Sequence, residues 1–277
     1  MNVLKDDALH LFARCVISGD KVEFYSYSNP IRSGFERKFD IVRHDTTDKR
    51  VDNVYRARQN ARRLIWSNMT PYTKFVTLTY REVVLDSVRV RRDVKTFVQN
   101  LRRTGYDVPY FYVLEHQQER GEREGNEGCL HVHMLIFNDE YLSLDTLNKC
   151  WKHGFTDISA VQDKKDPFDQ KIADIGAYVC KYITEQGLTL YGKHFYGCSK
   201  GLKRPVQERF YIEGLSDTTI GLHPDQVLSC MDISYSLTMQ HDFVTKQSCE
   251  KDYRSLSVSY FQGHWKEGNI IEEYQEE

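Results

Sequence analysis

Several patterns that would place this chain in a well-known class are missing from its sequence. No stretch approaches the run of about 18 apolar residues that a membrane span needs, and residues 1–15 lack the basic start and apolar run of a signal peptide. The seven cysteines form no Cys-x-x-Cys pair, and no Gly-x-x-x-x-Gly-Lys-Ser/Thr phosphate-binding loop occurs. These absences predict a cytoplasmic protein with reduced thiols, and they argue against a disulfide framework, a zinc knuckle and an attached helicase motor.

A surplus of basic residues is also missing. The chain carries 38 Lys and Arg against 40 Asp and Glu, a net charge of -2, whereas proteins that bind phosphate backbones usually carry a positive excess. Basic residues nonetheless crowd residues 56–63, 89–103 and 193–204, while acidic residues crowd residues 115–127 and 267–277. A basic face can exist on a nearly neutral molecule, although each cluster can equally be an ordinary solvated helix face.

With 40% hydrophobic and 28% charged residues, the 277-residue chain has the composition of a soluble globular protein, and it shows no internal repeat. Residues 1–60 contain strands and the start of a basic helix, which we interpret as an extension of the sheet. Residues 61–215 form the main domain. Residues 216–277 are an appended segment without a motif, ending in an acidic tail. Apolar periodicity predicts strands at 21–27, 35–42, 74–80, 109–115, 131–137, 155–161 and 208–213, and helices at 53–68, 90–103, 142–153 and 168–185.

Two histidines in the most apolar stretch are the first candidates for chemistry. Residues 130–137 read LHVHMLIF, a strand in which side chains alternate between faces, so His131 and His133 lie on the same face. Paired imidazoles can hold a metal, or they can be core histidines with satisfied hydrogen bonds. Glu115, at the end of the preceding strand, would add a carboxylate and leave positions for water and phosphate oxygens. This donor set suits Mg²⁺ or Mn²⁺, and zinc is compatible, unless Glu115 simply belongs to the acidic loop.

The second candidate is a pair of tyrosines in the predicted helix at 168–185. Tyr178 and Tyr182 are four residues apart, so they are neighbours on the helix surface with Lys181 beside them. They lie off the apolar stripe, which consists of Ile172, Ile175, Val179 and Ile183. Tyrosines placed among charged groups are candidate nucleophiles beside a cation. Amphipathic tyrosines at the margin of the core remain the alternative.

The two candidates explain each other chemically. A tyrosine hydroxyl has an ordinary pKa near 10 and is a poor nucleophile at neutral pH without help. A metal that withdraws charge from a phosphate, together with a nearby ammonium group, supplies that help. A metal site alone would indicate hydrolysis, whereas a metal site with paired tyrosines indicates a covalent phosphotyrosine and strand transfer.

These residues resemble the HUH (His-hydrophobe-His) endonucleases, and among them the rolling-circle replication initiators. Residues 75–80 (FVTLTY), 131–133 (HVH) and 178–182 (YVCKY) are similar to the three family motifs in family order, within residues 74–184. The Tyr-x-x-Lys-Tyr form is similar to the two-tyrosine initiators of small phages and plasmids. Residues 198–205 (CSKGLKRP) resemble the Ser-x-Gly-Leu-Lys-x-Pro segment of filamentous-phage and related replication-associated proteins.

The resemblance implies a fold and a set of roles. The fold is α+β, a central antiparallel β-sheet flanked by helices, with the histidine strand in the middle and the tyrosine helix alongside. A parallel α/β sheet is what the order of elements would otherwise also permit. His131 and His133 would bind Mg²⁺ or Mn²⁺, with Glu115 as the third ligand, and Tyr178 or Tyr182 would attack DNA. Some two-tyrosine relatives have a second lysine where Glu185 stands here, and this departure favours Tyr178 as the nucleophile.

On this interpretation the protein recognises single-stranded or hairpin origin DNA in a bacterial cell and nicks one strand, leaving a 3′ hydroxyl for the host polymerase. A host helicase is a further expected partner. Lys181 would steady the charged transition state. Basic side chains would hold the DNA by phosphate contacts, with Arg92, Lys95 and Lys203 as the candidates.

Alternatives remain open at this point. A plasmid relaxase or an HUH transposase uses similar chemistry, and an inactive origin-binding regulator could keep the fold without cleaving DNA. Residues 216–277 could bind a host helicase, mediate self-association or complete the fold.

Overall fold

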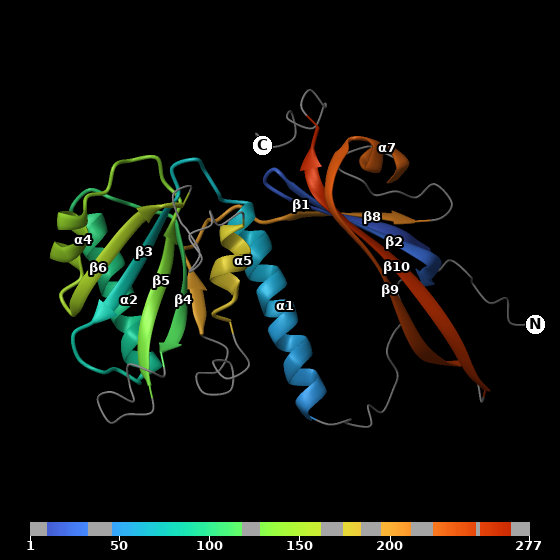
Figure 1. Cartoon of the computed structure of the whole chain (residues 1–277), viewed down its shortest axis with the longest axis horizontal. Helices are drawn as coiled ribbons and strands as arrows, with labels where there is room; N and C mark the ends of the chain where they lie inside the picture. Colours follow the sequence, from blue (N-terminus) through green and yellow to red (C-terminus); the bar gives the residue numbers. More distant parts are fainter. Residues whose placement is uncertain are drawn as a thin grey trace, which may run out of the picture. The chain divides into compact units, whose positions relative to one another are not determined.

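The computed structural model describes residues 10–32, 46–117, 128–161, 174–183, 195–211, 224–247 and 250–266. The chain divides into two compact units, one of residues 42–203 and one that joins residues 1–41 to residues 204–277 (Figure 1). These limits differ from our boundaries after residues 60 and 215, because the second unit is assembled from both ends of the chain. The strand expected at 35–42 lies outside the described residues. No helix in the described ranges is long and apolar enough to cross a bilayer.

The unit of residues 42–203 is built on an antiparallel sheet. Its strands are β3 (Lys74–Tyr80), β4 (Tyr110–Gln117), β5 (Cys129–Ile136), β6 (Gly154–Ala160) and β7 (Tyr196–Cys198). They are ordered β6-β3-β5-β4-β7, and every neighbouring pair runs antiparallel. The α+β fold class with a central antiparallel sheet is thereby confirmed, and β5, the histidine strand, occupies the middle position.

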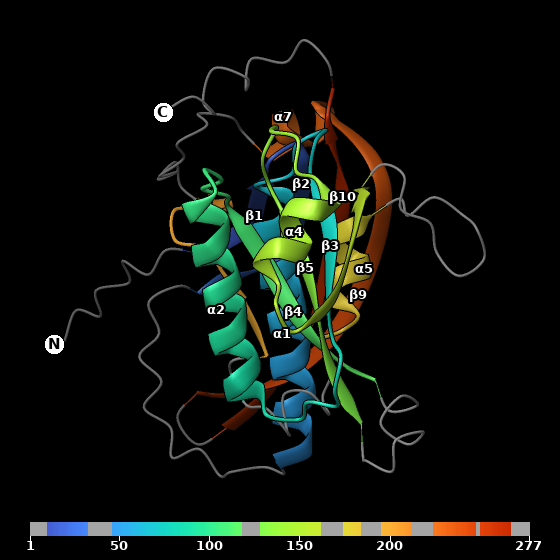
Figure 2. The same ribbon diagram turned by 90° about the vertical axis from the view of Figure 1, so that its left-hand side faces the viewer.

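Helices cover both faces of this sheet. They are α1 (Thr46–Trp66), α2 (Ser87–Arg103), α4 (Leu144–Cys150) and α5 (Ile175–Cys180). Helices α2 and α4 lie on one side of the sheet, and α5 and α1 lie on the other (Figures 1 and 2). Because β5 is central in the sheet and helices cover both faces, all of its residues are buried.

Alternation along β3 decides which side chains face which helices. Tyr80 points to the α2 side, where its hydroxyl donates to Asp93 of that helix. Thr77 and Thr79, of opposite parity, point to the side of α5. Helix α2 begins after Asp86, whose carboxylate accepts the N–H of Val88. Its buried apolar stripe is the predicted one, namely Val90, Val94, Phe97, Val98 and Leu101.

The other unit has a sheet of its own. Its strands are β1 (His10–Ser18), β2 (Lys21–Arg32), β8 (Val206–Tyr211), β9 (Met231–Gln247) and β10 (Glu250–Trp265), ordered β8-β1-β2-β10-β9 and antiparallel, with α7 (Pro224–Ser229). The N-terminal strands therefore pair with C-terminal ones and do not extend the histidine sheet. Alternation in a sequence marks a strand but does not name its neighbour. The same signal was present in β9, where Ile233, Tyr235 and Leu237 alternate with polar residues.

Candidate active site

Strand β5 presents two imidazoles to the face of the sheet that α5 covers. His131 and His133 are both buried. Their Nδ1 atoms lie 3.3 Å from Oγ1 of Thr79 and 3.4 Å from Oγ1 of Thr77 respectively, and Thr77 is the direct cross-strand partner of His133. With Nδ1 engaged, Nε2 is the nitrogen through which each ring would ligate a cation. Our sequence analysis missed both threonines, although their period-two spacing in FVTLTY puts them on one face.

Glu115 lies in β4 itself, directly across from His131. Its Oε2 accepts hydrogen bonds from Nε2 of His133 at 2.8 Å and from the side-chain amide of Gln117 at 3.0 Å. Burial by itself would raise the pKa of this carboxyl, but the hydrogen bond and positive charge of His133, the amide of Gln117 and the charge of His131 together lower the pKa below its usual range. Glu115 is therefore a carboxylate that stays ionised on the histidine face.

The donor chemistry of these side chains fits a divalent cation, since two imidazoles and a carboxylate meet on one face of the sheet. Among the described residues, however, no three His, Cys, Asp or Glu side chains are grouped closely enough to hold a metal ion. Glu115 and His133 are hydrogen-bonded to each other. A cation bound here would exchange that hydrogen bond for two metal bonds and would need the proton of His133 on Nδ1. A threonine hydroxyl both donates and accepts, so Thr77 accommodates either tautomer.

The tyrosine helix is shorter in the structure than the predicted span of 168–185. Helix α5 begins at Ile175, because Asp174 caps it by accepting the N–H of Ala177, and it ends at Cys180. The N–H groups of Tyr182 and Ile183 then bond to carbonyls three residues earlier, which continues the helix as a tighter turn. Ile172 and Glu185 lie outside the described residues.

The tyrosines pack on the histidines. The ring of Tyr182 stacks on that of His133, with centroids 4.4 Å apart and an angle of 19° between the planes. The ring of Tyr178 lies edge-on to Phe75 of β3 at 5.9 Å and perpendicular to the ring of Tyr182 at 5.9 Å. The two hydroxyls meet, with Tyr182 donating to Tyr178 at 3.2 Å. Candidate nucleophiles and candidate metal ligands thus share one face of one sheet.

Lys181 extends over both aromatic rings. Its Nζ lies 3.9 Å from the ring centroid of Tyr178 and 4.8 Å from that of Tyr182. Burial, the hydrogen bond to Tyr178 and the negative charge of Glu115 raise the pKa of Tyr182 well above its ordinary value. Tyr182 is therefore a neutral phenol at physiological pH, with a proton to donate to the oxygen of Tyr178.

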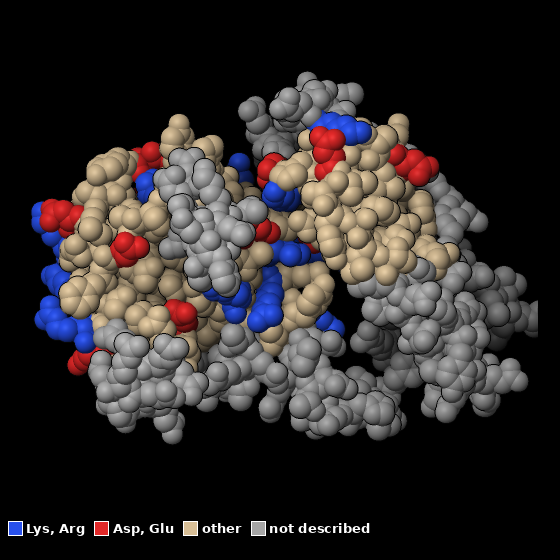
Figure 3. All heavy atoms as spheres, viewed as in Figure 1, with Lys and Arg blue, Asp and Glu red and all other residues tan. Residues whose placement is uncertain are grey.

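The three candidate DNA contacts do not gather around the tyrosines. Arg92 and Lys95 are exposed on α2, on the face of the sheet opposite the histidines. Lys203 is exposed after β7, where its backbone N–H and C=O both bond to the side-chain amide of Asn68 at 2.9 Å. Figure 3 shows Lys and Arg side chains along the left edge, where Figure 1 has α2 and α4.

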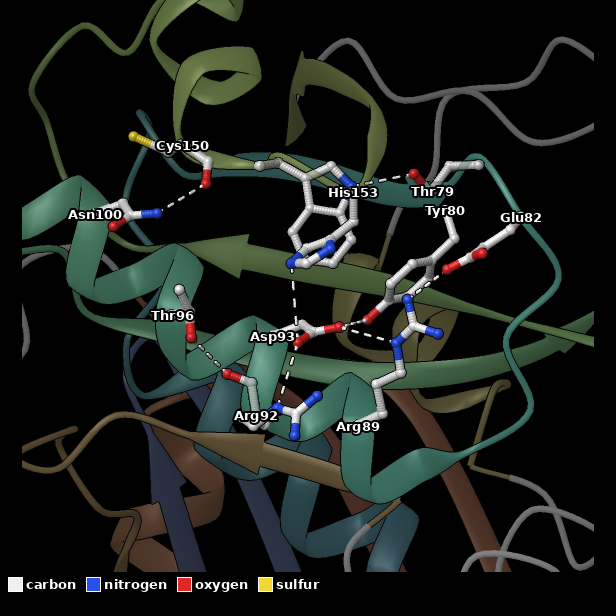
Figure 4. Close-up of polar contacts among 11 residues, drawn as sticks. Thr79, Tyr80, Glu82, Arg89, Arg92, Asp93, Thr96, Asn100, Cys150 and His153 are labelled. Carbon is white, nitrogen blue, oxygen red and sulfur yellow. Dashed lines mark hydrogen bonds and ion pairs between the residues drawn. The ribbon is translucent and has the colours of Figure 1, made fainter.

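Beneath the basic surface of α2 lies a buried carboxylate (Figure 4). Asp93 accepts a hydrogen bond from the hydroxyl of Tyr80 at 2.9 Å. Its oxygens lie 3.7 Å from Nε of Arg89, 3.7 Å from Nε of Arg92 and 3.8 Å from Nε2 of His153. Burial and the charge of Asp93 raise the pKa of Tyr80 above its ordinary value. This cluster ties α2 to the end of β3 and offsets part of the positive charge of the helix.

Comparison with known proteins adds a family to this geometry. The family model for replication-associated proteins of the ORF2 type matches residues 73–187, a span that contains β3, β4, β5 and α5 with both tyrosines. No curated protein and no solved structure matches the chain. The match supports a role as a replication initiator and an interaction with DNA, and it is consistent with nuclease activity in general.

Proposed function

We propose that this chain initiates rolling-circle DNA replication by nicking one strand at an origin and carrying it as a 5′-phosphotyrosine. One observation carries the proposal, namely that Tyr178 and Tyr182 lie on the histidine face of the sheet, with Tyr182 stacked on His133 at 4.4 Å. The similarity to replication-associated proteins supports DNA as the substrate.

His131, His133 and Glu115 are the residues that would hold Mg²⁺ or Mn²⁺. The bound cation supplies charge neutralisation and polarisation of the scissile phosphate. The chain contributes the orientation of the ligands, since Thr77 and Thr79 hold the imidazoles and Glu115 remains ionised because its pKa is lowered. The low exposure of both histidines restricts water around them.

Tyr178 is the proposed nucleophile of the first nick. Its oxygen bonds to phosphorus while the bond from phosphorus to the 3′ oxygen breaks, and the departing oxygen takes up a proton to become the 3′ hydroxyl. Tyr182 stabilises the phenolate of Tyr178 by donating a hydrogen bond to it. Lys181, above both rings, stabilises the same negative charge.

Tyr182 has a second role in the proposal. Once Tyr178 carries DNA, Tyr182 is the other tyrosine hydroxyl of the pair, and it performs the transfer that ends a round of replication. The raised pKa of Tyr182 keeps it protonated, and hence inactive as a nucleophile, until that stage.

Binding of the origin is proposed to use phosphate contacts outside the cleavage site. Arg92 and Lys95 on α2 would hold DNA that flanks the nick, and Lys203 would contact backbone near β7. Host helicase and polymerase would then act on the opened strand and its 3′ hydroxyl.

The test is direct detection of the covalent adduct. The full chain is incubated with Mn²⁺ and a labelled pool of single-stranded DNA with a randomised core, and protein that carries DNA after denaturation is recovered and mapped by mass spectrometry. We expect an adduct on Tyr178 that requires the cation. Absence of any adduct, or an adduct that persists in the Tyr178→Phe/Tyr182→Phe double variant, would refute the mechanism.

The open arrangement of the candidate ligands favours one other function, an origin-binding regulator without cleavage. That function predicts DNA binding that is unaffected by a chelator and no adduct under any metal condition, so the same experiment separates the two.

A further inference from the structure

Helix α5 is too short to hold its own position. It has six residues, and isolated helices below about 12 residues are marginal in water because nucleation is costly. The geometry of Tyr178 and Tyr182 therefore depends on what fixes the two ends of this segment. Both ends are held by side chains of α1.

At the N-terminal end, a tryptophan reinforces the helix cap. The indole Nε1–H of Trp66 donates to Oδ1 of Asp174 at 3.0 Å, and the same oxygen accepts the N–H of Ala177 at 3.0 Å. Trp66 is buried, and Arg62 lies over its ring at 4.7 Å. A Cβ on Gly176 would come within 3.1 Å of Nε1 of Trp66, so α5 lies tightly against α1 at this point.

At the C-terminal end, an arginine satisfies a carbonyl. Nε of Arg58 donates to the backbone oxygen of Ile183 at 2.7 Å. The thiol of Cys180 in turn donates to the backbone oxygen of Arg58 at 3.4 Å. Carbonyls at the end of a helix have no partner within it, so this contact takes the place of a cap.

The spacing of the two contacts matches the length of the tyrosine segment. Arg58 and Trp66 are separated by two turns of α1, about 12 Å at 1.5 Å per residue, and Asp174 and Ile183 bracket a segment of similar length. Two side chains of one long helix thereby hold both ends of a short one.

We infer that Arg58 and Trp66 are positioning residues, which hold α5 so that the tyrosine oxygens lie over the histidine face. This inference rests on the proposed function, because it assigns the contacts a role in the attack of Tyr178. Neither residue contacts the reacting atoms, so their effect acts through the placement of the nucleophile.

The test measures the chemical step in the full chain. Single-turnover adduct formation is followed at saturating concentrations of one oligonucleotide selected from the randomised pool, with Mn²⁺, well below the melting temperature. Arg58→Met and Trp66→Phe remove the two donors and keep apolar bulk, and Arg58→Lys keeps a donor. Arg56→Met is the matched control, because Arg56 is exposed on α1 and lies two residues, about 200°, around the helix from Arg58.

We expect the rate of adduct formation in Arg58→Met and Trp66→Phe to fall by about tenfold with unchanged DNA affinity, since a misplaced nucleophile loses rate and not binding. Arg58→Lys should recover most of the rate, and Arg56→Met should match the parent chain. The share of adduct on Tyr182 should rise in both slow variants.

Two results would overturn the inference. If both variants melt at lower temperature but keep the parental rate and the parental distribution of adducts, the contacts are merely structural. If Arg56→Met slows the reaction as much as Arg58→Met, the loss of charge explains the effect. Absence of adduct in the parent chain would instead contradict the proposed function, so the two failures are distinguishable.

Discussion

Tyr178 and Tyr182 are chemically unequal although the sequence presents them as a pair. Tyr182 is stacked on His133 and donates its proton to Tyr178, which accepts it and lies closer to the ammonium of Lys181. The tyrosine that accepts the hydrogen bond is the one whose phenolate is stabilised.

This inequality predicts different single variants. Tyr178→Phe should abolish the first adduct, because Tyr182 is held as the proton donor of the pair. Tyr182→Phe should keep the adduct on Tyr178 but form it about tenfold more slowly, the range of a hydrogen bond to a charged group. Rates from denaturing gels and the adduct position from mass spectrometry check this. Equal activity of the two variants would contradict it.

The threonines of β3 lead to a second prediction at the residue scale. Thr77→Val and Thr79→Val remove the partners of the imidazole Nδ1 atoms, so the Mn²⁺ concentration for half-maximal adduct formation should rise by about tenfold or more. Thr96→Val, exposed on α2, is the control and should leave the metal requirement unchanged. A metal titration of the adduct rate measures the effect.

At the scale of the element, α2 shows how a basic helix is anchored. Its apolar stripe packs on the sheet, and Asp93 receives the hydroxyl of Tyr80 while two arginines of the same helix lie close to the carboxylate. Because the pKa of Tyr80 is raised in the folded state, the folded chain keeps a proton that the unfolded chain loses above about pH 10. This contribution to stability is fully present below about pH 10 and declines as the pH rises further.

Tyr80→Phe should therefore change both stability and its pH dependence. We expect a loss of about 1–3 kcal/mol near neutral pH, since the buried carboxylate of Asp93 loses a donor. The decline of stability above about pH 10 should become shallower than in the parent chain. Urea unfolding across this pH range measures both effects. Tyr72→Phe, at an exposed residue, is the control, and an unchanged pH profile in Tyr80→Phe would contradict the assignment.

At the scale of the whole molecule, the two sheets are made differently from the chain. The histidine sheet uses strands from one continuous segment, whereas β1 and β2 pair with β8 and β10 from the far end of the sequence. Truncation should reveal this difference. Residues 42–203 contain every strand of the histidine sheet and should fold and form the adduct, while residues 1–203 leave β1 and β2 without partners and should aggregate. Circular dichroism, light scattering and the adduct assay test this, and a soluble, monomeric 1–203 fragment would count against it.

The sequence by itself determined the local features of this protein. The alternation around HVH predicted a buried strand with both imidazoles on one face, the apolar stripe predicted α2, and the four-residue spacing predicted that Tyr178 and Tyr182 are neighbours; the structure confirms each of these. Such features depend on the periodicity of strands and helices, which a single segment carries.

Only the tertiary structure decided which segments meet. It paired the N-terminal strands with β8 and β10, placed Arg92 and Lys95 on the sheet face opposite the histidines, set Thr77 beside His133 and held the tyrosine helix between Trp66 and Arg58. These contacts join residues far apart in the chain. Their free energy comes from burial and hydrogen bonds made across elements, and no local spacing in the sequence encodes them.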